Sequence, residues 1–348
     1  MIVKALIMSN PNKERLLEDK RRFTDMITQL KKGGVEAKHA FIRLYDQLVG
    51  VLDQEKPDIV FPAAYYVQKP DGEKINIAYK LDKMHKPYIG SDSATLELVL
   101  SKSALKARWK QKQVLTPEFC TVHREENFSE KVSSLLESTP FPFIIKPDKE
   151  GNSRGLDESS IVFNRESLRL KGEKLLRSYD QILIEKYLGE ASDIREYTIA
   201  LIGHNEHMLI MPARLMLKVK HKNRIITTRD KDTHNTIAKP VLDLSLRAQL
   251  TDFARKAFKV SRVRDYARLD VMLTGGLLYA IEINGQPMVP DKWFEACAKG
   301  AGLSKSQYLN AIFFAGILRC KEEGYPHLQV PDEMIKLLPE AARKVLGG

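Results

Sequence analysis

The stretch that decides the fold is ARLDVMLTGGLLYAIEING, residues 267–285. Two apolar runs flank the Gly275-Gly276 dipeptide, which favours the tight turn of a β-hairpin. The pattern therefore predicts two antiparallel strands that lie side by side. Polar side chains interrupt both runs at every second position, at the end of the hairpin that lies away from the turn.

Four polar side chains gather at this end of the predicted hairpin. Because side chains alternate between the two faces of a strand, Arg268 and Asp270 share one face of the first strand. Glu282 and Asn284 share one face of the second. Oxygen ligands of this kind suit a Mg²⁺ ion that also binds substrate phosphates. The alternative is a solvent-exposed sheet face with ordinary ion pairs.

A second candidate site lies upstream, where Lys146 ends a predicted strand and the loop DKEGNSRG, residues 148–155, follows it. The backbone N–H groups of such a loop can bind phosphate oxygens, and the lysine supplies a point charge. The loop is not a Walker A sequence, because no Gly-Lys-Ser/Thr follows its second glycine, and an ordinary hairpin is the alternative. Residues 182–188, ILIEKYL, form either an ordinary amphipathic strand or a hinge whose backbone reads a purine.

The charge of the chain is concentrated in two places. The 348 residues carry 56 Lys and Arg against 45 Asp and Glu, a net charge of +11. Residues 102–112 contribute +5 and residues 213–231 contribute +6, so the remainder is neutral. Two compact clusters suit a small polyanion such as a nucleoside triphosphate better than the broad basic face of a nucleic-acid-binding protein.

Composition places the chain among globular proteins. Hydrophobic residues make up 43%, which excludes a disordered or low-complexity chain. The three cysteines are far apart and predict neither a disulfide framework nor a metal clip, which favours a reducing, cytoplasmic setting. No apolar run is long enough to cross a membrane, and the first residues lack a signal-peptide pattern.

The periodicity predicts an α/β protein that is α+β in its central part. We expect four segments, with the boundaries 1–93, 94–187, 188–321 and 322–348. The first is a parallel α/β domain that ends in a strand and a turn at 86–91, and a helical stretch over 93–114 follows it. A basic loop occupies 218–239 in the third segment. The last segment is expected to be a surface appendage with one short helix.

These motifs and their order resemble the ATP-grasp enzymes, and within them the D-alanine–D-alanine ligase family. The resemblance covers roughly residues 55–315 and includes KPYIGSDSATLELVLSK, residues 86–102, and KPDKEGNSRGL, residues 146–156. It implies a three-domain ATP-grasp fold, in which an N-terminal parallel α/β domain carries substrate and two α+β domains grip ATP. The implied reaction joins a carboxylate to an amine through an acyl phosphate and produces ADP.

The resemblance also implies roles for individual residues. ATP would be bound by Lys102, Lys146, Gly151, Asn152, Ser153, Glu185, Lys186, Tyr187, Leu188 and Glu196, with Glu190 as a rival to Glu196. Two Mg²⁺ ions, or Mn²⁺ in their place, would be bound by Asp270, Glu282 and Asn284. Catalytic roles would fall to Arg268, to Ser153 of the glycine loop, and to Lys218 and Lys220 of a basic lid. The implied partners are small amino-acid or peptide substrates and a second copy of the chain, without a membrane or nucleic acid.

The chain departs from the family pattern on the substrate side. The family's Ser-x-Glu-x-x-Val-Ser signature is replaced by SNPNKER, residues 9–15, with Glu14 as a loose substitute. Its His-Gly is replaced by AYYV, residues 64–67, its loop serine by Asn152, and its Ser/Thr-x-Pro-Gly-Met-Thr segment by GQPMVPDK, residues 285–292. These departures predict a product other than D-alanyl-D-alanine. Two alternatives stay open: an ATP-grasp enzyme that phosphorylates its substrate or loads an amino acid onto a carrier protein, and a noncatalytic nucleotide- or nucleic-acid-binding module.

Overall fold

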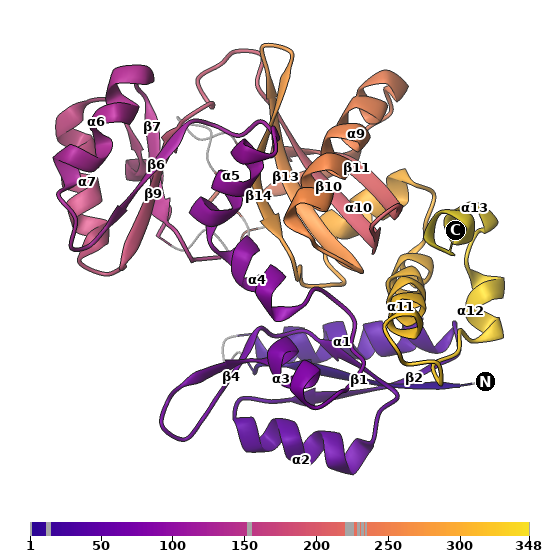
Figure 1. The fold of residues 1–348 in the computed structure, drawn as a ribbon. Coiled ribbons are helices and arrows are strands. Elements are labelled where there is room, and N and C mark those ends of the chain that lie inside the picture. Colours follow the sequence, from indigo (N-terminus) through magenta and orange to yellow (C-terminus); the bar gives the residue numbers. More distant parts are fainter. Residues whose placement is uncertain are drawn as a thin grey trace.

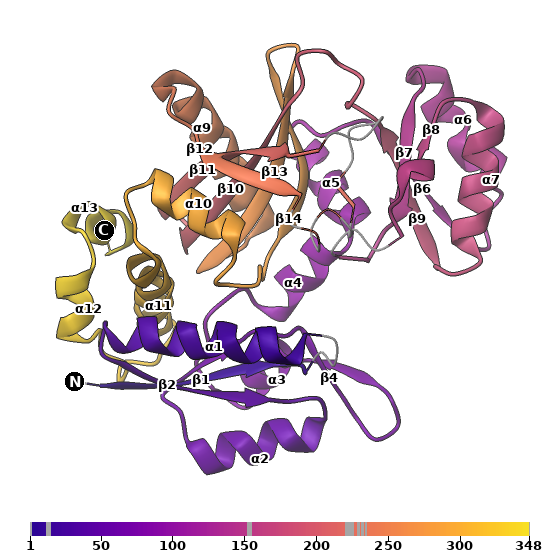
Figure 2. The same ribbon diagram turned by 180° about the vertical axis from the view of Figure 1, so that it is seen from behind.

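Figure 1 shows the computed structural model, which describes residues 2–11, 15–151, 155–219, 226–227, 230, 233 and 235–347. Within these ranges the strands form sheets of three, five, two and four strands. Helices pack beside the three larger sheets, and the two ends of the chain lie on the same side of the molecule (Figures 1 and 2). This mixed architecture confirms the predicted α/β fold class. No helix in the described ranges is both long enough and apolar enough to cross a membrane.

The N-terminal part is a parallel sheet, as the alternation of strands and helices predicts. β1 (Val3–Ser9) lies between β2 (Val35–Phe41) and β3 (Ile59–Pro62) and is parallel to both. α1 (Leu16–Lys31) and α2 (Tyr45–Glu55) lie on opposite sides of this sheet (Figure 1). A small hairpin and a helix follow: β4 (Tyr66–Gln68), β5 (Lys74–Asn76) and α3 (Ile77–Lys83).

The strand predicted at residues 86–91 is wrong. Tyr88 forms only an isolated bridge with Val60, because the chain turns at Gly90, which has a φ of +116°. The N–H of Gly90 donates to the buried carboxylate of Asp265 at 2.7 Å. The segment therefore connects the parallel sheet to the largest sheet instead of extending a strand.

The helical stretch predicted over 93–114 is present but is divided into two helices, α4 (Ser93–Leu100) and α5 (Lys102–Gln111), a break that was not predicted. Ser101 separates them because it has extended backbone angles and caps α5 with its side chain. The carboxylate of Asp148 accepts from the hydroxyl of Ser101 and from the N–H of Ser103, each at 2.7 Å. The break thus places the start of α5 against the glycine loop.

The four-stranded sheet lies in a lobe of its own (Figure 1). Its antiparallel strands, in spatial order, are β6 (Phe119–His123), β9 (Gln181–Lys186), β7 (Phe143–Pro147) and β8 (Ile161–Val162). α6 (Phe128–Ser138) and α7 (Arg165–Leu176) cover its outer face. β7 and β8 flank the glycine loop, as predicted. Only glycine fits at Gly155, because its φ is +76° and a Cβ there would lie 2.8 Å from the ring of Pro147.

The largest sheet contains the hairpin that the sequence predicts. Its antiparallel strands, in spatial order, are β12 (Thr236–Pro240), β11 (His207–Leu217), β10 (Arg195–His204), β13 (Tyr266–Thr274) and β14 (Leu277–Asn284). Gly275 and Gly276 form the β13–β14 turn with φ angles of +55° and +75°. α9 (Leu244–Ser261) and α10 (Lys292–Gly300) cover its two faces. β12 occupies the end of the segment that was predicted to be a basic loop.

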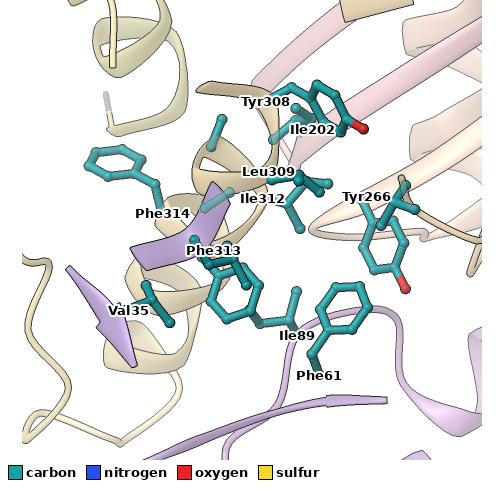
Figure 3. Packing of buried hydrophobic residues seen from close by; sticks show 14 of the residues in the cluster. Val35, Phe61, Ile89, Ile202, Tyr266, Tyr308, Leu309, Ile312, Phe313 and Phe314 are labelled. Atoms are coloured by element: carbon teal, nitrogen blue, oxygen red, sulfur yellow. The ribbon is translucent and has the colours of Figure 1, made fainter. Parts of the chain in front are cut away.

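The largest apolar core joins the two ends of the chain. In Figure 3, Phe61 of β3 stacks on Tyr266 of β13 and on Phe313 of α11 (Lys305–Glu322), with ring centroids 5.3 and 5.8 Å apart. The prediction that residues 322–348 form a surface appendage with one helix is wrong. This tail forms α12 (Asp332–Leu337) and α13 (Glu340–Gly347), and Met334 and Leu346 are buried in the same core. Each helix buries only one or two of its own side chains, which is too sparse for a helical period to show in the sequence.

Candidate active site

A pocket opens between the four-stranded sheet and the five-stranded sheet. β7, β9 and the residues after β9 line one side, and β10, β11, β13 and β14 line the other. Eight of the residues predicted to bind ATP or metal line it: Lys146, Glu185, Lys186, Tyr187, Leu188, Glu196, Asp270 and Glu282. The structure thus brings together two candidates that are distant in the sequence: the strand-end lysine with its hinge, and the polar hairpin.

The polar end of the β13–β14 hairpin forms one wall of the pocket. Arg268 pairs with Asn284 in the strand register and Asp270 pairs with Glu282, so the four side chains lie together as the alternation predicts. On the neighbouring strand β10, the hydroxyl of Thr198 donates to Asp270 Oδ1 at 2.9 Å. This contact orients one carboxylate of the wall.

Arg268 is a buried cation beside this wall, although neither it nor Asn284 is among the described residues that line the pocket. Its Nε lies 3.6 Å from Asp270 Oδ1, its Nη1 lies 3.3 Å from Asp291 Oδ2, and its guanidinium carbon lies 4.5 Å from the centre of the Trp293 ring. Burial by itself would lower the pKa of Arg268, but the carboxylates of Asp270 and Asp291 outweigh burial and raise it. The guanidinium therefore stays charged and can stabilise negative charge that develops in the pocket.

Opposite this wall lies a buried group that we call the lysine–glutamate triad, which consists of Lys146, Glu185 and Lys106. The two carboxylate oxygens of Glu185 lie 2.5 Å from Lys146 Nζ and 2.9 Å from Lys106 Nζ. Burial would raise the pKa of Glu185, but the ammonium groups of Lys106 and Lys146 lower it to about 2. Glu185 is therefore ionised, and with both lysines protonated the triad carries a net charge of +1.

Lys102, the first residue of α5, faces the start of the glycine loop. Its Nζ donates to the carbonyl oxygen of Asp148 at 3.2 Å and to that of Glu150 at 2.5 Å. Burial lowers the pKa of Lys102, and the carboxylate of Glu282 opposes this effect. Lys102 therefore ties α5 to the loop, and it is not among the described residues that line the pocket.

The predicted hinge lies along one edge of the pocket. Tyr187 and Leu188 line the pocket, and the ammonium of Lys186 donates to the carbonyl oxygens of Pro140 at 2.9 Å and Phe141 at 3.0 Å. Glu196, the residue predicted to meet a ribose, also lines the pocket. Its rival Glu190 is exposed and is not one of the lining residues in the described ranges.

Several predicted residues lie elsewhere. Asn152, Ser153 and Lys220 lie outside the described residues, as do Glu14 and most of the basic lid. Gly151 is exposed, and a Cβ at this position would meet no atom within 4 Å. Lys218 is exposed, and its N–H donates to the carbonyl oxygen of Asn235 at 2.7 Å. Burial lowers the pKa of Lys292, and the charge of Lys218 lowers it further, so these two ammonium groups lie near each other.

The hairpin wall offers hard oxygen donors for a metal ion. No cluster of three or more His, Cys, Asp or Glu side chains within the described ranges could hold a metal by itself. The predicted set has instead two carboxylates, Asp270 and Glu282, which are paired in the register, and the amide of Asn284. Because Mg²⁺ is usually held by one or two carboxylates together with substrate phosphates, this donor set fits a magnesium ion.

The far end of the hairpin meets the N-terminal parallel sheet. Asn284 Oδ1 accepts from the N–H of Gln286 at 3.1 Å and from the hydroxyl of Tyr65 at 3.4 Å. The side-chain amide of the buried Gln286 donates to the carbonyl oxygens of Pro62 and Ala64, just after β3. The segments that depart most from the family pattern therefore lie directly beside the polar hairpin.

Three residues of the site were missed by the sequence analysis as individual residues. Lys106 lies one helical turn after Lys102, and this spacing of four residues on a predicted helix could have indicated that both face the same way. Thr198 lies in a strand that was predicted, but nothing in the sequence shows that it is next to Asp270. Trp293 under Arg268 had no signal in the sequence, because its contact depends on how α10 packs on the sheet.

Comparisons with known proteins agree with this geometry. A family model described as D-ala D-ala ligase C-terminus matches residues 109–313. The D-alanine–D-alanine ligase of Carboxydothermus hydrogenoformans is 26% identical over 296 residues, which cover 83% of this chain and 89% of that protein. The crystal structure of the Bacillus anthracis D-alanine–D-alanine ligase complexed with ATP has a TM-score of 0.70 at 20% identity, over 92% of this chain and 100% of that one. The VanG D-Ala:D-Ser ligase of Enterococcus faecalis has a TM-score of 0.69 at 15% identity, over 91% of this chain and 100% of that one.

Proposed function

We propose that this chain, which belongs to the D-alanine–D-alanine ligase family of ATP-grasp enzymes, activates a carboxylate as an acyl phosphate and joins it to an amine. The observation that carries the proposal is the pocket itself. It has Lys146, Glu185 and the hinge on one side and the carboxylates of the hairpin on the other. The phosphates of a nucleotide need positively charged side chains, and the cation bound to them needs carboxylate ligands, so such a site requires both groups.

In this proposal the pocket holds ATP between the two sheets. Lys146 and Lys102 meet phosphates, Tyr187 and Leu188 meet the adenine, and Glu196 meets the ribose. The glycine loop and the basic lid close over the phosphates and exclude water, which would otherwise hydrolyse an activated acyl group. Bound Mg²⁺ would be held by Asp270, Glu282 and Asn284 and would neutralise charge on the phosphates.

The proposed chemistry has two steps. A carboxylate oxygen of the donor attacks the γ-phosphorus of ATP, and the bond between this phosphorus and ADP breaks. The amine nitrogen of the acceptor then attacks the acyl carbon, phosphate leaves, and the nitrogen loses a proton. Arg268 faces the oxygen on which negative charge develops, because its guanidinium is buried beside Asp270 and stays charged.

We further propose that the product is not D-alanyl-D-alanine. The residues of the substrate side differ from the family pattern where the N-terminal sheet meets the hairpin, and Tyr65 and Gln286 now contact the hairpin there. An amino acid or peptide of different shape would suit such a wall. The family resemblance also supports a homodimer, in which each chain carries its own pocket.

The test is release of phosphate from ATP and Mg²⁺ by the purified protein, against L- and D-amino acids singly and in pairs and against short peptides. We expect release that depends on a donor and an acceptor together, and mass spectrometry should find a condensed product. Rapid formation of D-alanyl-D-alanine, at an ordinary enzyme rate of about 1–10³ s⁻¹, would contradict the proposed change of substrate. A stable phosphorylated product without condensation would contradict the ligase mechanism.

A further inference from the structure

We propose that Lys106 is a positioning residue for nucleotide binding. Because Lys106 shares the carboxylate of Glu185 with Lys146, Glu185 does not fully neutralise Lys146, and the ammonium of Lys146 can bind phosphate. The inference rests on the proposed function, since it requires that Lys146 meets the phosphates of ATP. It assigns a role to a side chain that does not line the pocket in the described part of the chain and that therefore acts through its neighbours.

Lys106 is enclosed on all sides. Its exposed fraction is 0%, and its Nζ lies 2.9 Å from Glu185 Oε2 and 2.7 Å from Thr116 Oγ1. Thr116 in turn donates to the carbonyl oxygen of Ala280 at 2.8 Å, on the strand that carries Glu282. Lys106 thus connects α5, the carboxylate on β9 and the backbone of β14.

The charges of the triad explain why a second lysine matters. A buried carboxylate with a single lysine partner would neutralise that lysine and hold it in place. Here Glu185 gives one oxygen to Lys146 and the other to Lys106, so one net positive charge remains beside the pocket. Burial of an ammonium group is costly, and a purely apolar side chain could fill the same space at lower cost. The lysine is therefore better explained by the charge that it supplies than by packing.

The test compares proteins whose triads differ in net charge. The wild-type triad carries +1, Lys106→Met reduces it to 0, and Lys106→Met combined with Glu185→Gln restores +1. Dissociation constants for MgATP, MgADP and adenosine are measured by calorimetry. We expect Lys106→Met to weaken MgATP and MgADP roughly tenfold, which corresponds to about 1.4 kcal/mol, and to leave adenosine unchanged. The double variant should bind MgATP more tightly than Lys106→Met.

Lys171 provides a matched control. It is also a buried lysine, with 8% exposure and an ion pair to Asp157 at 2.9 Å, but it lies on α7 and is not among the pocket residues. Lys171→Met should leave all three affinities unchanged. The inference is overturned if the double variant binds MgATP no better than Lys106→Met, or if Lys106→Met weakens adenosine as much as MgATP. A wild-type protein that binds no MgATP would contradict the proposed function itself, which is a separate outcome.

A pH series on the wild type tests the inference even if the variants fold poorly. Burial lowers the pKa of Lys106 to about 8, while Glu185 on β9 and Glu282 on β14 oppose this effect and Lys146 on β7 adds to it. MgATP affinity should therefore fall as the pH rises through about 8 to 9, although the phosphates are then fully ionised. Burial also lowers the pKa of Lys102, which would add to this fall. Where Lys106→Met folds, the same series on that variant measures the contribution of Lys102. An affinity that stays constant between pH 7 and 10 would overturn the inference.

Discussion

The two sides of the site bury polar groups in different ways. On the nucleotide side, buried charges face opposite charges, as in the contacts of Glu185 with Lys146 and Lys106. On the substrate side, polar groups meet hydroxyl, amide and carbonyl groups, as in the contact of Tyr65 with Asn284. A site for a polyanion must keep buried cations charged and therefore needs buried carboxylates as well. A small substrate with few charges makes no such demand on the fold.

This difference explains why the two sides differ in how closely they follow the family pattern. Loss of Glu185 from the triad would leave two buried ammonium groups without their counter-charge, which costs about 3–5 kcal/mol. Hydroxyl and amide contacts are each worth only about 0.5–1.5 kcal/mol, so the substrate side can change one residue at a time. The departures at residues 64–67 and at Gly285 and Gln286 lie on the side where change is less costly. Asp291, near the end of the second departing segment, instead pairs with the buried Arg268.

The largest effect is expected from a variant of the nucleotide side, at the polar end of the β13–β14 hairpin. Glu282→Gln removes a carboxylate that is paired with Asp270 in the register, while the shape of the side chain is kept. Because the phosphates would then lose a charged oxygen ligand of their cation, we expect ATP-dependent ligation to fall by at least about 10³-fold. The rate of phosphate release with donor and acceptor present measures this loss.

Glu118→Gln is the matched control for this variant. Glu118 is an exposed carboxylate that pairs with the exposed Lys110 at 2.7 Å, away from the pocket. We expect its ligation rate to equal that of the wild type and the melting temperatures of both variants to stay close to it. Ligation at the wild-type rate by Glu282→Gln would remove the hairpin from the proposed mechanism.

The sequence predicts features that depend on neighbouring residues better than contacts between distant segments. The hairpin at residues 267–285 was predicted together with the side chains that share a face of each strand, because alternation and a Gly-Gly turn are local features of the sequence. The contacts of Lys106 with Glu185 and of Trp293 with Arg268 join segments that are far apart in the sequence, and only packing brings them together. The prediction for residues 322–348 was wrong for a related reason. Met334 and Leu346 are buried by contacts with α11 and the N-terminal sheet, and they do not belong to a periodic apolar face that the sequence could show. The segment boundaries and the roles of the site residues stay predictions.

A second comparison of the two sides is their sensitivity to acid. His39 on β2 stacks on Phe23 at 4.3 Å between ring centroids, and burial lowers its pKa to about 4. The unfolded chain binds this proton near its ordinary pKa of 6.5, so the unfolded state takes up more protons between pH 6.5 and 4. We expect the free energy of unfolding to fall by about 1–2 kcal/mol over this interval, with allowance for the solvent around the partly exposed ring.

Urea unfolding at a series of pH values measures this loss, and His39→Phe is the matched variant because it keeps an aromatic ring and cannot titrate. The nucleotide side should respond later. The folded pKa of Glu185, about 2, lies below its ordinary value of 4.5, so its contribution is present above pH 4.5 and is lost only as the pH falls toward 2. An equal loss of stability in His39→Phe between pH 6.5 and 4 would show that another group causes it.

The smallest effect is expected from a variant that removes a contact between the substrate side and the nucleotide side. Tyr65→Phe removes the hydroxyl that lies 3.4 Å from Asn284 Oδ1 and keeps the ring in place. A hydrogen bond of this kind is worth about 0.5–1.5 kcal/mol, so we expect kcat/KM for the amino-acid substrate to fall roughly twofold to tenfold. The dissociation constant of MgATP should change less, since the triad and the hinge are untouched and Asn284 Oδ1 still accepts from the N–H of Gln286. Tyr79→Phe, which removes the hydroxyl of a tyrosine that is 49% exposed on α3, should change neither quantity. If Tyr65→Phe weakened MgATP as much as the amino-acid substrate, the two sides would act as one surface, and their different ways of burying polar groups would not correspond to different ligands.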